Sequence, residues 1–181
     1  MKKALIIIDI QNDYFDQGTM TLVGSDTACR NAGLLLERFR TDSLPVIYIQ
    51  HIATRPDAAF FLPNTKGAEI HETIIPLENE KVIVKHYPNS FRETVLSEYL
   101  NEKQISDLVI CGMMTHMCVD ATTRAAKDLG FNISVIGDAC ATKDLEYNGK
   151  VVKSNEVQNS FLAALNYFYS TVQTTEQYLN Q

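Results

Sequence analysis

Three side chains of reactive type follow apolar runs of the sequence closely. Asp9 follows ALIII, Lys85 ends VIVK, and Cys118 comes a few residues after LVIC. A carboxylate, an ammonium and a thiol are the base, the cation and the nucleophile that acyl transfer through a cysteine requires. Asp9, Lys85 and Cys118 are therefore the first candidates for a catalytic centre.

The apolar runs are typical of strands that are covered on both faces, because their Ile and Val residues are continuous rather than alternating with polar ones. Helical patterns separate these runs, and this order predicts an α/β protein with a doubly wound, mainly parallel sheet. The strands are expected at residues 4–9, 46–51, 82–85, 108–111 and 133–138, with a short last one at 171–174, and the helices at 27–39, 91–100, 117–129 and 151–168.

Ligands of open α/β sheets bind beyond the carboxyl ends of the strands. His51 and Asp138 also end predicted strands, so they join the three candidates at this edge. Each residue taken singly has a plain structural alternative. Asp9 and Asp138 could cap turns, Lys85 could be solvated, and His51 could be a hydrogen-bonded surface imidazole. The combination favours a site.

Cys118 is expected at the start of a helix, close to Lys85. A free thiol has a pKa of ~8.5, so we expect the helix dipole, the ammonium and a neighbouring base to activate it. His116 is the rival partner, but side chains two residues apart at a helix start point in different directions. The other cysteines, Cys29, Cys111 and Cys140, form no C-x-x-C pair with it and are expected to be free thiols.

Composition excludes several classes of function. The chain has 181 residues, 45% of them hydrophobic, and no linker-like stretch, which predicts one domain over residues 1–181. A net charge of -6 with no basic run argues against nucleic acid as a partner. The apolar start is too short for a signal peptide or a membrane span, so no membrane partner and a cytoplasmic location are expected.

Residues 51–80 connect two predicted strands and contain three prolines but little helical pattern. Connections of this length in compact domains are usually functional. The apolar stretch AAFFLP at 58–63 is interpreted either as a lid or pocket wall, or as a segment that packs on the core or in a subunit interface.

Three longer stretches resemble the signature regions of the isochorismatase-like cysteine hydrolases. They are DIQNDYF (9–15), VIVKHYPNSF (82–91) and CGMMTHMCVDATTRAAKDLGFNISVIGDACAT (111–142). The resemblance implies a three-layer α/β/α fold with a six-stranded parallel sheet. It also implies a catalytic triad of Asp9, Lys85 and Cys118, a cis peptide between Met113 and Met114, and an oxyanion hole made by the N–H groups of Met114 and Cys118.

Substrates across that family include nicotinamide, carbamoylated amines, ureides, a streptothricin lactam and isochorismate. The namesake branch lacks the cysteine nucleophile, so Cys118 favours C–N hydrolysis over vinyl ether cleavage. Nicotinamidases carry a metal-binding D-x-H. The corresponding Ile49-Gln50-His51 lacks the Asp, so we expect no metal and no cofactor, with His51 and His71 left open as an adventitious site.

The sequence therefore predicts a cysteine amidohydrolase in which Asp9, hydrogen-bonded to Cys118 and balanced by Lys85, takes the thiol proton. The partner is expected to be a small-molecule substrate, and the family resemblance suggests a homo-oligomer. Alternatives left open are a vinyl ether hydrolase, a binding or regulatory module without turnover, and a redox-sensing thiol. Residues interpreted as pocket residues are Phe15, His51, Tyr87, Asn89 and Phe91.

Overall fold

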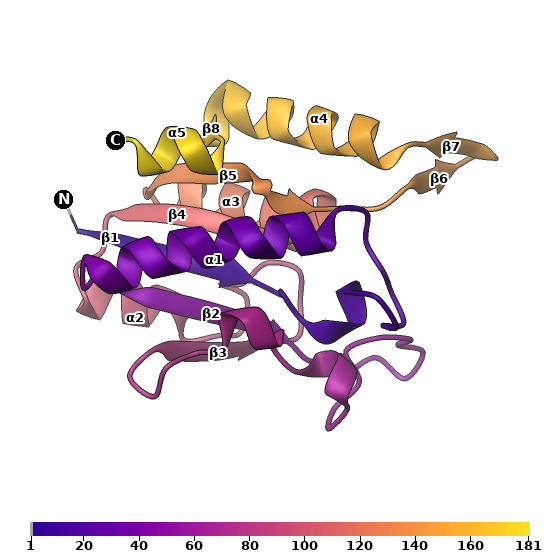
Figure 1. Cartoon of the computed structure of the whole chain (residues 1–181), viewed down its shortest axis with the longest axis horizontal. Helices are drawn as coiled ribbons and strands as arrows, with labels where there is room; N and C mark the ends of the chain where they lie inside the picture. The colour runs from indigo at the N-terminus through magenta and orange to yellow at the C-terminus, as the bar shows by residue number, and fades with distance from the viewer. Residues whose placement is uncertain (1) are drawn as a thin grey trace.

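The computed structural model describes residues 2–181, and its central feature is a six-stranded parallel sheet (Figure 1). The strand order is β3-β2-β1-β4-β5-β8, and each neighbouring pair is parallel. The strands are β1 (Lys3–Ile8), β2 (Val46–His51), β3 (Lys81–Lys85), β4 (Asp107–Met113), β5 (Asn132–Ala141) and β8 (Thr171–Gln173). The predicted α/β class and sheet are confirmed.

Helices cover both faces of the sheet and give the expected three layers (Figure 1). One apolar core joins the sheet to α1 and α5, and the other joins it to α2, α3 and the end of α4. The helices are α1 (Ser25–Thr41), α2 (Leu96–Glu102), α3 (Asp120–Asp128), α4 (Ser154–Ala164) and α5 (Thr175–Leu179). None of the helices in residues 2–181 combines the length and apolar character that a membrane-spanning helix needs.

The chain reverses its direction of travel across the sheet between β1 and β4. β2 and β3 lie on one side of β1, and β4, β5 and β8 lie on the other. Such a switch point leaves a crevice at the carboxyl ends of the two central strands. Asp9 follows β1 and Cys118 follows β4, so both lie at this position.

Gly112 near the end of β4 brings β1 and β4 unusually close together. Its φ is +131°, and a Cβ atom at this position would lie 2.0 Å from the carbonyl oxygen of Ile8. No side chain fits in that space, and the backbone conformation is one that only glycine adopts readily. The two strands that carry Asp9 and the Cys118 turn therefore meet across a glycine.

Some predicted boundaries are wrong. The helix expected at 91–100 begins only at Leu96 because side chains hold the preceding residues in turns: Asn89 Oδ1 accepts from the Phe91 N–H, and Thr94 Oγ1 donates to the carbonyl of Ser90. These local hydrogen bonds compete with helix formation.

The helix expected at 151–168 begins at Ser154, whose N–H donates to Asp144 Oδ1. Val151 and Val152 belong instead to a small antiparallel hairpin of β6 (Leu145–Tyr147) and β7 (Lys150–Val152) that projects from the body of the fold (Figure 1). The hairpin residues are exposed or half-buried, so they form no buried apolar face from which the sequence would predict these strands.

Asp138 does not end a strand, because β5 continues to Ala141. The β4–β5 register shifts between Ile110 and Gly112, and Asp138 lies in the irregular part of β5. Its Oδ1 accepts hydrogen bonds from the N–H and hydroxyl of Thr175 at the start of α5. Asp138 therefore caps the start of a helix far along the chain, rather than a following turn.

Candidate active site

The ammonium of Lys85 is the centre of a buried cluster at the switch point. Its Nζ lies 2.6 Å from Asp9 Oδ2, 3.3 Å from Cys118 Sγ and 2.9 Å from His51 Nδ1. Asp9 and Lys85 are 0% exposed, and Cys118 is 6% exposed. The fold thus brings together Asp9, Lys85 and Cys118, three residues that are far apart in the sequence.

Each of these residues is placed by the end of a strand. Asp9 follows β1 with a φ of +50°, a conformation that aspartate tolerates better than most residues. Its N–H donates to the carbonyl of Ile49 in β2. Lys85 is the last residue of β3 and points inward, since the alternation along this edge strand leaves Val82 and Val84 exposed.

Cys118 lies in a turn of π-helix, Thr115–Val119, between β4 and α3. The carbonyl of Met114 accepts from the N–H groups of Met117 and Val119 and closes this turn. The Met113–Met114 peptide is cis, as the family resemblance implies. The turn places Cys118 on the same face of the sheet as α3.

The expected hydrogen bond between Asp9 and Cys118 is not formed. A carboxylate oxygen of Asp9 lies within 4.8 Å of the sulfur, and the Lys85 ammonium donates to both groups. Asp9 Oδ1 is buried and has no hydrogen-bond partner. A free acceptor oxygen beside the thiol is what a general base needs, although the two are linked through Lys85 rather than directly.

The thiol of Cys118 is not activated in the way the sequence suggests. Burial and the negative charge of Asp9 raise its pKa above the ordinary value, and Lys85 only partly offsets this. A buried group avoids ionisation because charge is poorly solvated in the interior. These surroundings favour the thiol over the thiolate, so attack by the sulfur requires a group that takes its proton.

Charge pairing keeps the ammonium of Lys85 protonated. Burial lowers the pKa of Lys85, but Asp9 and Cys118 raise it by more, so the net shift is upward. The 2.6 Å ion pair with Asp9 is fully buried. Burial and the Lys85 charge lower the pKa of His51 to about 4, so this imidazole is neutral near pH 7.

The five expected pocket residues have different surroundings. Of these, only His51 is hydrogen-bonded to the triad. Phe15 packs against His71 in a tilted arrangement, with ring centroids 3.9 Å apart. Tyr87 packs under the guanidinium of Arg92, 3.6 Å from its ring centroid.

Asn89 is one of the remaining two pocket candidates, and its side-chain oxygen is used in the turn that precedes α2. Phe91 stacks on Phe131 and packs against the apolar cluster that contains Cys118. The backbone N–H groups of Met114 and Cys118 stay a prediction for the oxyanion hole.

The sequence reasoning missed three residues that follow β1. Gln11 is fully buried, and its amide donates to the carbonyls of His51 and Ala68 while accepting from the His51 N–H. Asp13 accepts from the Phe61 N–H and from Thr19. The signal was present in the run of polar residues directly after a buried strand, where exposure is otherwise expected.

Tyr14 is the third of these residues. Its ring is 1% exposed and packs edge-on against Phe61, with centroids 4.7 Å apart. Burial and the neighbouring Cys118 raise the pKa of its phenol well above the ordinary value. Tyr14 therefore lies near the thiol as a neutral phenol.

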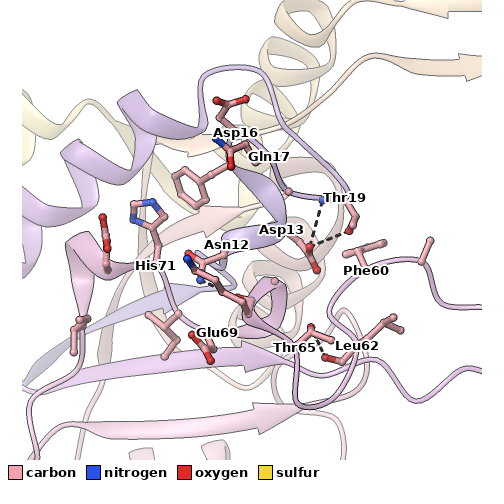
Figure 2. Close-up of a pocket in the computed structure, with 18 residues that line it drawn as sticks. Asn12, Asp13, Asp16, Gln17, Thr19, Phe60, Leu62, Thr65, Glu69 and His71 are labelled. Atoms are coloured by element: carbon pink, nitrogen blue, oxygen red, sulfur yellow. Dashed lines mark hydrogen bonds between the residues drawn. The ribbon is translucent and has the colours of Figure 1, made fainter.

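Residues 58–63 pack over Tyr14 and His51. Phe61 is 1% exposed and contacts both Tyr14 and His51, and Asp13 holds its backbone. Phe60 and Leu62 line a cavity of about 630 Å³ between residues 12–19 and 59–75 (Figure 2), and the Phe60 ring also packs against Tyr14. None of the triad residues lines this cavity. The segment packs as a wall between the triad and the cavity.

Asp9, His51 and Cys118 carry donor atoms that all lie within 4.8 Å of one another, a spacing that could hold a metal ion. The Lys85 Nζ is hydrogen-bonded to all three, so a lysine cation already stands among these donors. His71, the other histidine considered for a metal, lies 3.7 Å from Cys29 Sγ and accepts from the Thr73 N–H. It is not part of this cluster.

Comparison with known proteins finds similar chains and a similar fold. Residues 3–177 match the family model for the isochorismatase domain. The chain is 51% identical to the uncharacterized isochorismatase family protein YddQ of Bacillus subtilis, over 99% of both chains. Its fold superposes with a TM-score of 0.96 on the crystal structure of an isochorismatase hydrolase from Oleispira antarctica, at 44% identity over 99% of this chain and 97% of that one.

The chain is also similar to a relative whose name states an activity. The chain is 31% identical to a streptothricin hydrolase of Streptomyces noursei, over 79% of this chain and 51% of that one. The match of the family model over nearly the whole chain, together with the identity to YddQ, shows that this chain belongs to the isochorismatase family.

Proposed function

We propose that this protein is a cysteine-dependent hydrolase that cleaves a C–N bond of a small amide, ureide or lactam. The observation that carries the proposal is the buried Lys85 ammonium that donates to Asp9 and to Cys118 at once, beside a carboxylate oxygen without a partner. Acyl transfer through a thiol needs a base that receives the proton and a cation that stabilises the sulfur.

The first half of the reaction forms an acyl-enzyme. Asp9 takes the thiol proton while the Cys118 sulfur attacks the carbonyl carbon, which gives a tetrahedral oxyanion. The N–H groups of Met114 and Cys118 are proposed to hold that oxyanion. Asp9 then returns the proton to the leaving nitrogen, the C–N bond breaks, and an amine or ammonia departs.

The second half hydrolyses the thioester. Asp9 takes a proton from a water molecule, the resulting hydroxide attacks the acyl carbon, and the C–S bond breaks. The Cys118 sulfur regains the proton held by Asp9, and a carboxylic acid is released, or a carbamic acid where the substrate is a ureide. Each proton that Asp9 accepts is handed on within the same half-reaction.

The raised pKa of Cys118 is compatible with this scheme. The resting cluster contains one carboxylate, one ammonium, a neutral thiol and a neutral imidazole, so its net charge is zero. Proton transfer from Cys118 to Asp9 produces a thiolate and a carboxylic acid, and the net charge stays zero. Losing the proton to solvent would instead leave a buried net negative charge, which is the costly process that the pKa of Cys118 reflects.

The substrate class rests on chemistry and on a relative. A cysteine nucleophile suits acyl carbons attached to nitrogen, and the similarity to a streptothricin hydrolase supports a lactam or amide. The redox-sensor alternative is disfavoured because oxidation of a cysteine proceeds through its thiolate, which burial suppresses here.

The test is a panel of primary amides, N-carbamoyl amines, ureides and lactams including streptothricin, assayed for release of ammonia or amine. We expect turnover of at least one compound, with a thioester-mass adduct on the intact protein. Cys118→Ala should lose both, and the matched variant Cys29→Ala, which truncates another buried free thiol, should keep both. Turnover that survives in Cys118→Ala would sink the mechanism. A wild-type protein that binds but never cleaves any panel member would favour a binding module.

A further inference from the structure

We propose that His51 is a positioning residue that holds the Lys85 ammonium in the orientation shared by Asp9 and Cys118. The proposal rests on the proposed function and adds to the triad a residue that acts through Lys85 rather than on the substrate. It goes beyond a role of His51 as a pocket residue or as a metal ligand.

The first argument is a count of donors and acceptors. An ammonium has three N–H donors and no acceptor. Lys85 Nζ has three neighbours at hydrogen-bond distance: Asp9 at 2.6 Å, His51 at 2.9 Å and Cys118 at 3.3 Å. Lys85 is 0% exposed, so water does not take the place of any of them. Without His51, one N–H would be buried without a partner, at a substantial cost.

The second argument is the protonation state of the imidazole. Burial and the Lys85 charge both disfavour the imidazolium, and Arg55 and His86 act in the same direction, while Asp9 opposes them. His51 is therefore neutral near pH 7, and the nitrogen that faces an ammonium must be the unprotonated one. The ring hydrogen then resides on Nε2, which is hydrogen-bonded to no group of residues 2–181.

The third argument is that the surroundings fix His51 from independent directions. Its backbone N–H donates to Gln11 Oε1 at 2.7 Å, and its carbonyl accepts from Gln11 Nε2 at 2.9 Å. The register of β2 and β3 places His51 directly beside Lys85. The Phe61 ring lies 5.8 Å from the imidazole centroid. An acceptor held this firmly determines where the ammonium points.

A neutral acceptor also has an electrostatic advantage over a second carboxylate. It satisfies the third N–H without adding charge, so the cluster keeps its net charge of zero before and after proton transfer. A second carboxylate would compete with the thiolate for the ammonium and would bind a proton of its own. A neutral histidine meets both requirements.

The experiment compares three variants that differ in where they place an acceptor. The side-chain oxygen of His51→Asn can occupy the position of Nδ1, that of His51→Gln lies further out near Nε2, and His51→Leu has none. We expect His51→Asn to keep kcat within about threefold. His51→Gln and His51→Leu should lose about 10- to 100-fold in kcat with KM nearly unchanged, the size expected for one lost hydrogen bond to a charged group.

The pH profile gives a second readout. As the pH falls towards 4 the wild-type imidazole acquires a proton and can no longer accept from Lys85, so His51 contributes an acid limb with an apparent pKa of about 4. His51→Asn should lack this contribution. A change in packing alone would leave the acid limb where it is.

A third readout needs no turnover. In protein with ¹⁵N-labelled lysine, a buried and hydrogen-bonded ammonium gives a slowly exchanging Nζ signal by NMR. The Lys85 signal should persist in His51→Asn and be lost or broadened in His51→Leu. If no panel substrate is cleaved, the proposed function fails while this signal still tests the positioning of Lys85.

Two results would overturn the proposal. If His51→Asn is as impaired as His51→Leu and both raise KM, the imidazole acts on the substrate through Nε2. If all three variants keep wild-type kcat and the Lys85 signal is unchanged in His51→Leu, the third hydrogen bond has no role in orientation.

Discussion

Two thiols of this molecule lie beside basic side chains, and only one of them has the surroundings of a nucleophile. Cys118 Sγ is 3.3 Å from the Lys85 ammonium, and Cys29 Sγ is 3.7 Å from His71 Nδ1. Both cysteines are buried, and burial is the main cause that raises the pKa of each. By proximity alone, the Cys29–His71 pair resembles a cysteine-protease dyad more closely than the triad does.

The difference lies in the third partner. Asp9 stands beside Cys118 with an unpaired oxygen and is balanced by Lys85. Within residues 2–181, no carboxylate accepts a hydrogen bond from Cys29 or from His71, and His71 Nδ1 already accepts from the Thr73 N–H. A thiol and a base in contact are therefore insufficient. In the Cys118 cluster, proton transfer only moves a negative charge from Asp9 to the sulfur, and both lie beside the Lys85 ammonium. Transfer from Cys29 to His71 would instead create two new charges in the interior, which is costly.

The largest expected effect is on catalysis by the base. Asp9→Asn keeps the shape of the side chain but cannot accept the thiol proton, so kcat should fall by about 10²- to 10⁴-fold. The matched change at the other pair, His71→Asn, should leave kcat within about threefold. Steady-state kinetics on the best panel substrate measures both. If Asp9→Asn and His71→Asn lowered kcat equally, the Cys118 site would not differ in function from the Cys29–His71 pair.

The next effect is on stability. Lys85→Met leaves the Asp9 carboxylate buried and unpaired, which should lower the free energy of unfolding by about 3–5 kcal/mol. The double variant Asp9→Asn/Lys85→Met should recover much of that loss because no buried charge remains. Urea denaturation at pH 7 measures all three proteins. A single variant as stable as the wild type would show that the ion pair is not the buried, closed contact described above.

Thiol reactivity should be slow for both cysteines in the free protein. The pKa of Cys29 is raised to about 11, and that of Cys118 is raised too, so iodoacetamide at pH 7 should modify each at least about tenfold more slowly than free cysteine. Peptide mapping by mass spectrometry identifies the labelled thiol. Rapid labelling of Cys118 alone would contradict the upward pKa shift of this thiol.

The smallest effect is on the pH dependence of stability. Burial lowers the pKa of His51 to about 4 in the folded protein, below the value of ~6.5 for an unfolded histidine. Its contribution to stability is complete above pH 6.5 and is lost as the pH falls towards 4, because the unfolded chain binds the proton first. His51→Asn should lose less stability between pH 7 and pH 4 than the wild type, by urea unfolding.

His71→Asn provides the comparison for this measurement. Its imidazole pKa is also lowered by burial, but His71 is less buried than His51 and does not face an ammonium, so its removal should flatten the pH dependence less. An identical pH dependence in the wild type and His51→Asn would contradict the shift at His51.

The sheet and the meeting of Asp9, Lys85 and Cys118 at its edge could be predicted because they depend on patterns that are local in sequence. Continuous Ile and Val runs identify buried strands, and parallel strands must present their carboxyl ends at one edge. Asp9, Lys85 and Cys118 follow from that rule. The prediction that Asp138 ends a strand is wrong because β5 continues to Ala141. That extension depends on pairing with β4, which the local sequence does not specify.

The electrostatics of the site could not be predicted in the same way. The direction of the Cys118 pKa shift depends on how deeply the turn is buried and on whether Asp9 or Lys85 dominates, and both are properties of the assembled fold. Likewise, His51 and Ala68, the partners of Gln11, and Phe61, one of the partners of Asp13, lie 40 or more residues further along the chain. Long-range contacts of this kind leave no periodicity in the sequence.

The distance between Asp9 and the Cys118 turn depends on the backbone at Gly112. A single methyl group at this position would lie 2.0 Å from the Ile8 oxygen, so β1 and β4 would have to separate. Asp9 is the next residue after Ile8, and the Cys118 turn follows β4. A substitution at Gly112 can thus abolish activity while Asp9, Lys85 and Cys118 are all present. The presence of these reactive residues is therefore not sufficient to predict activity in a chain of this fold.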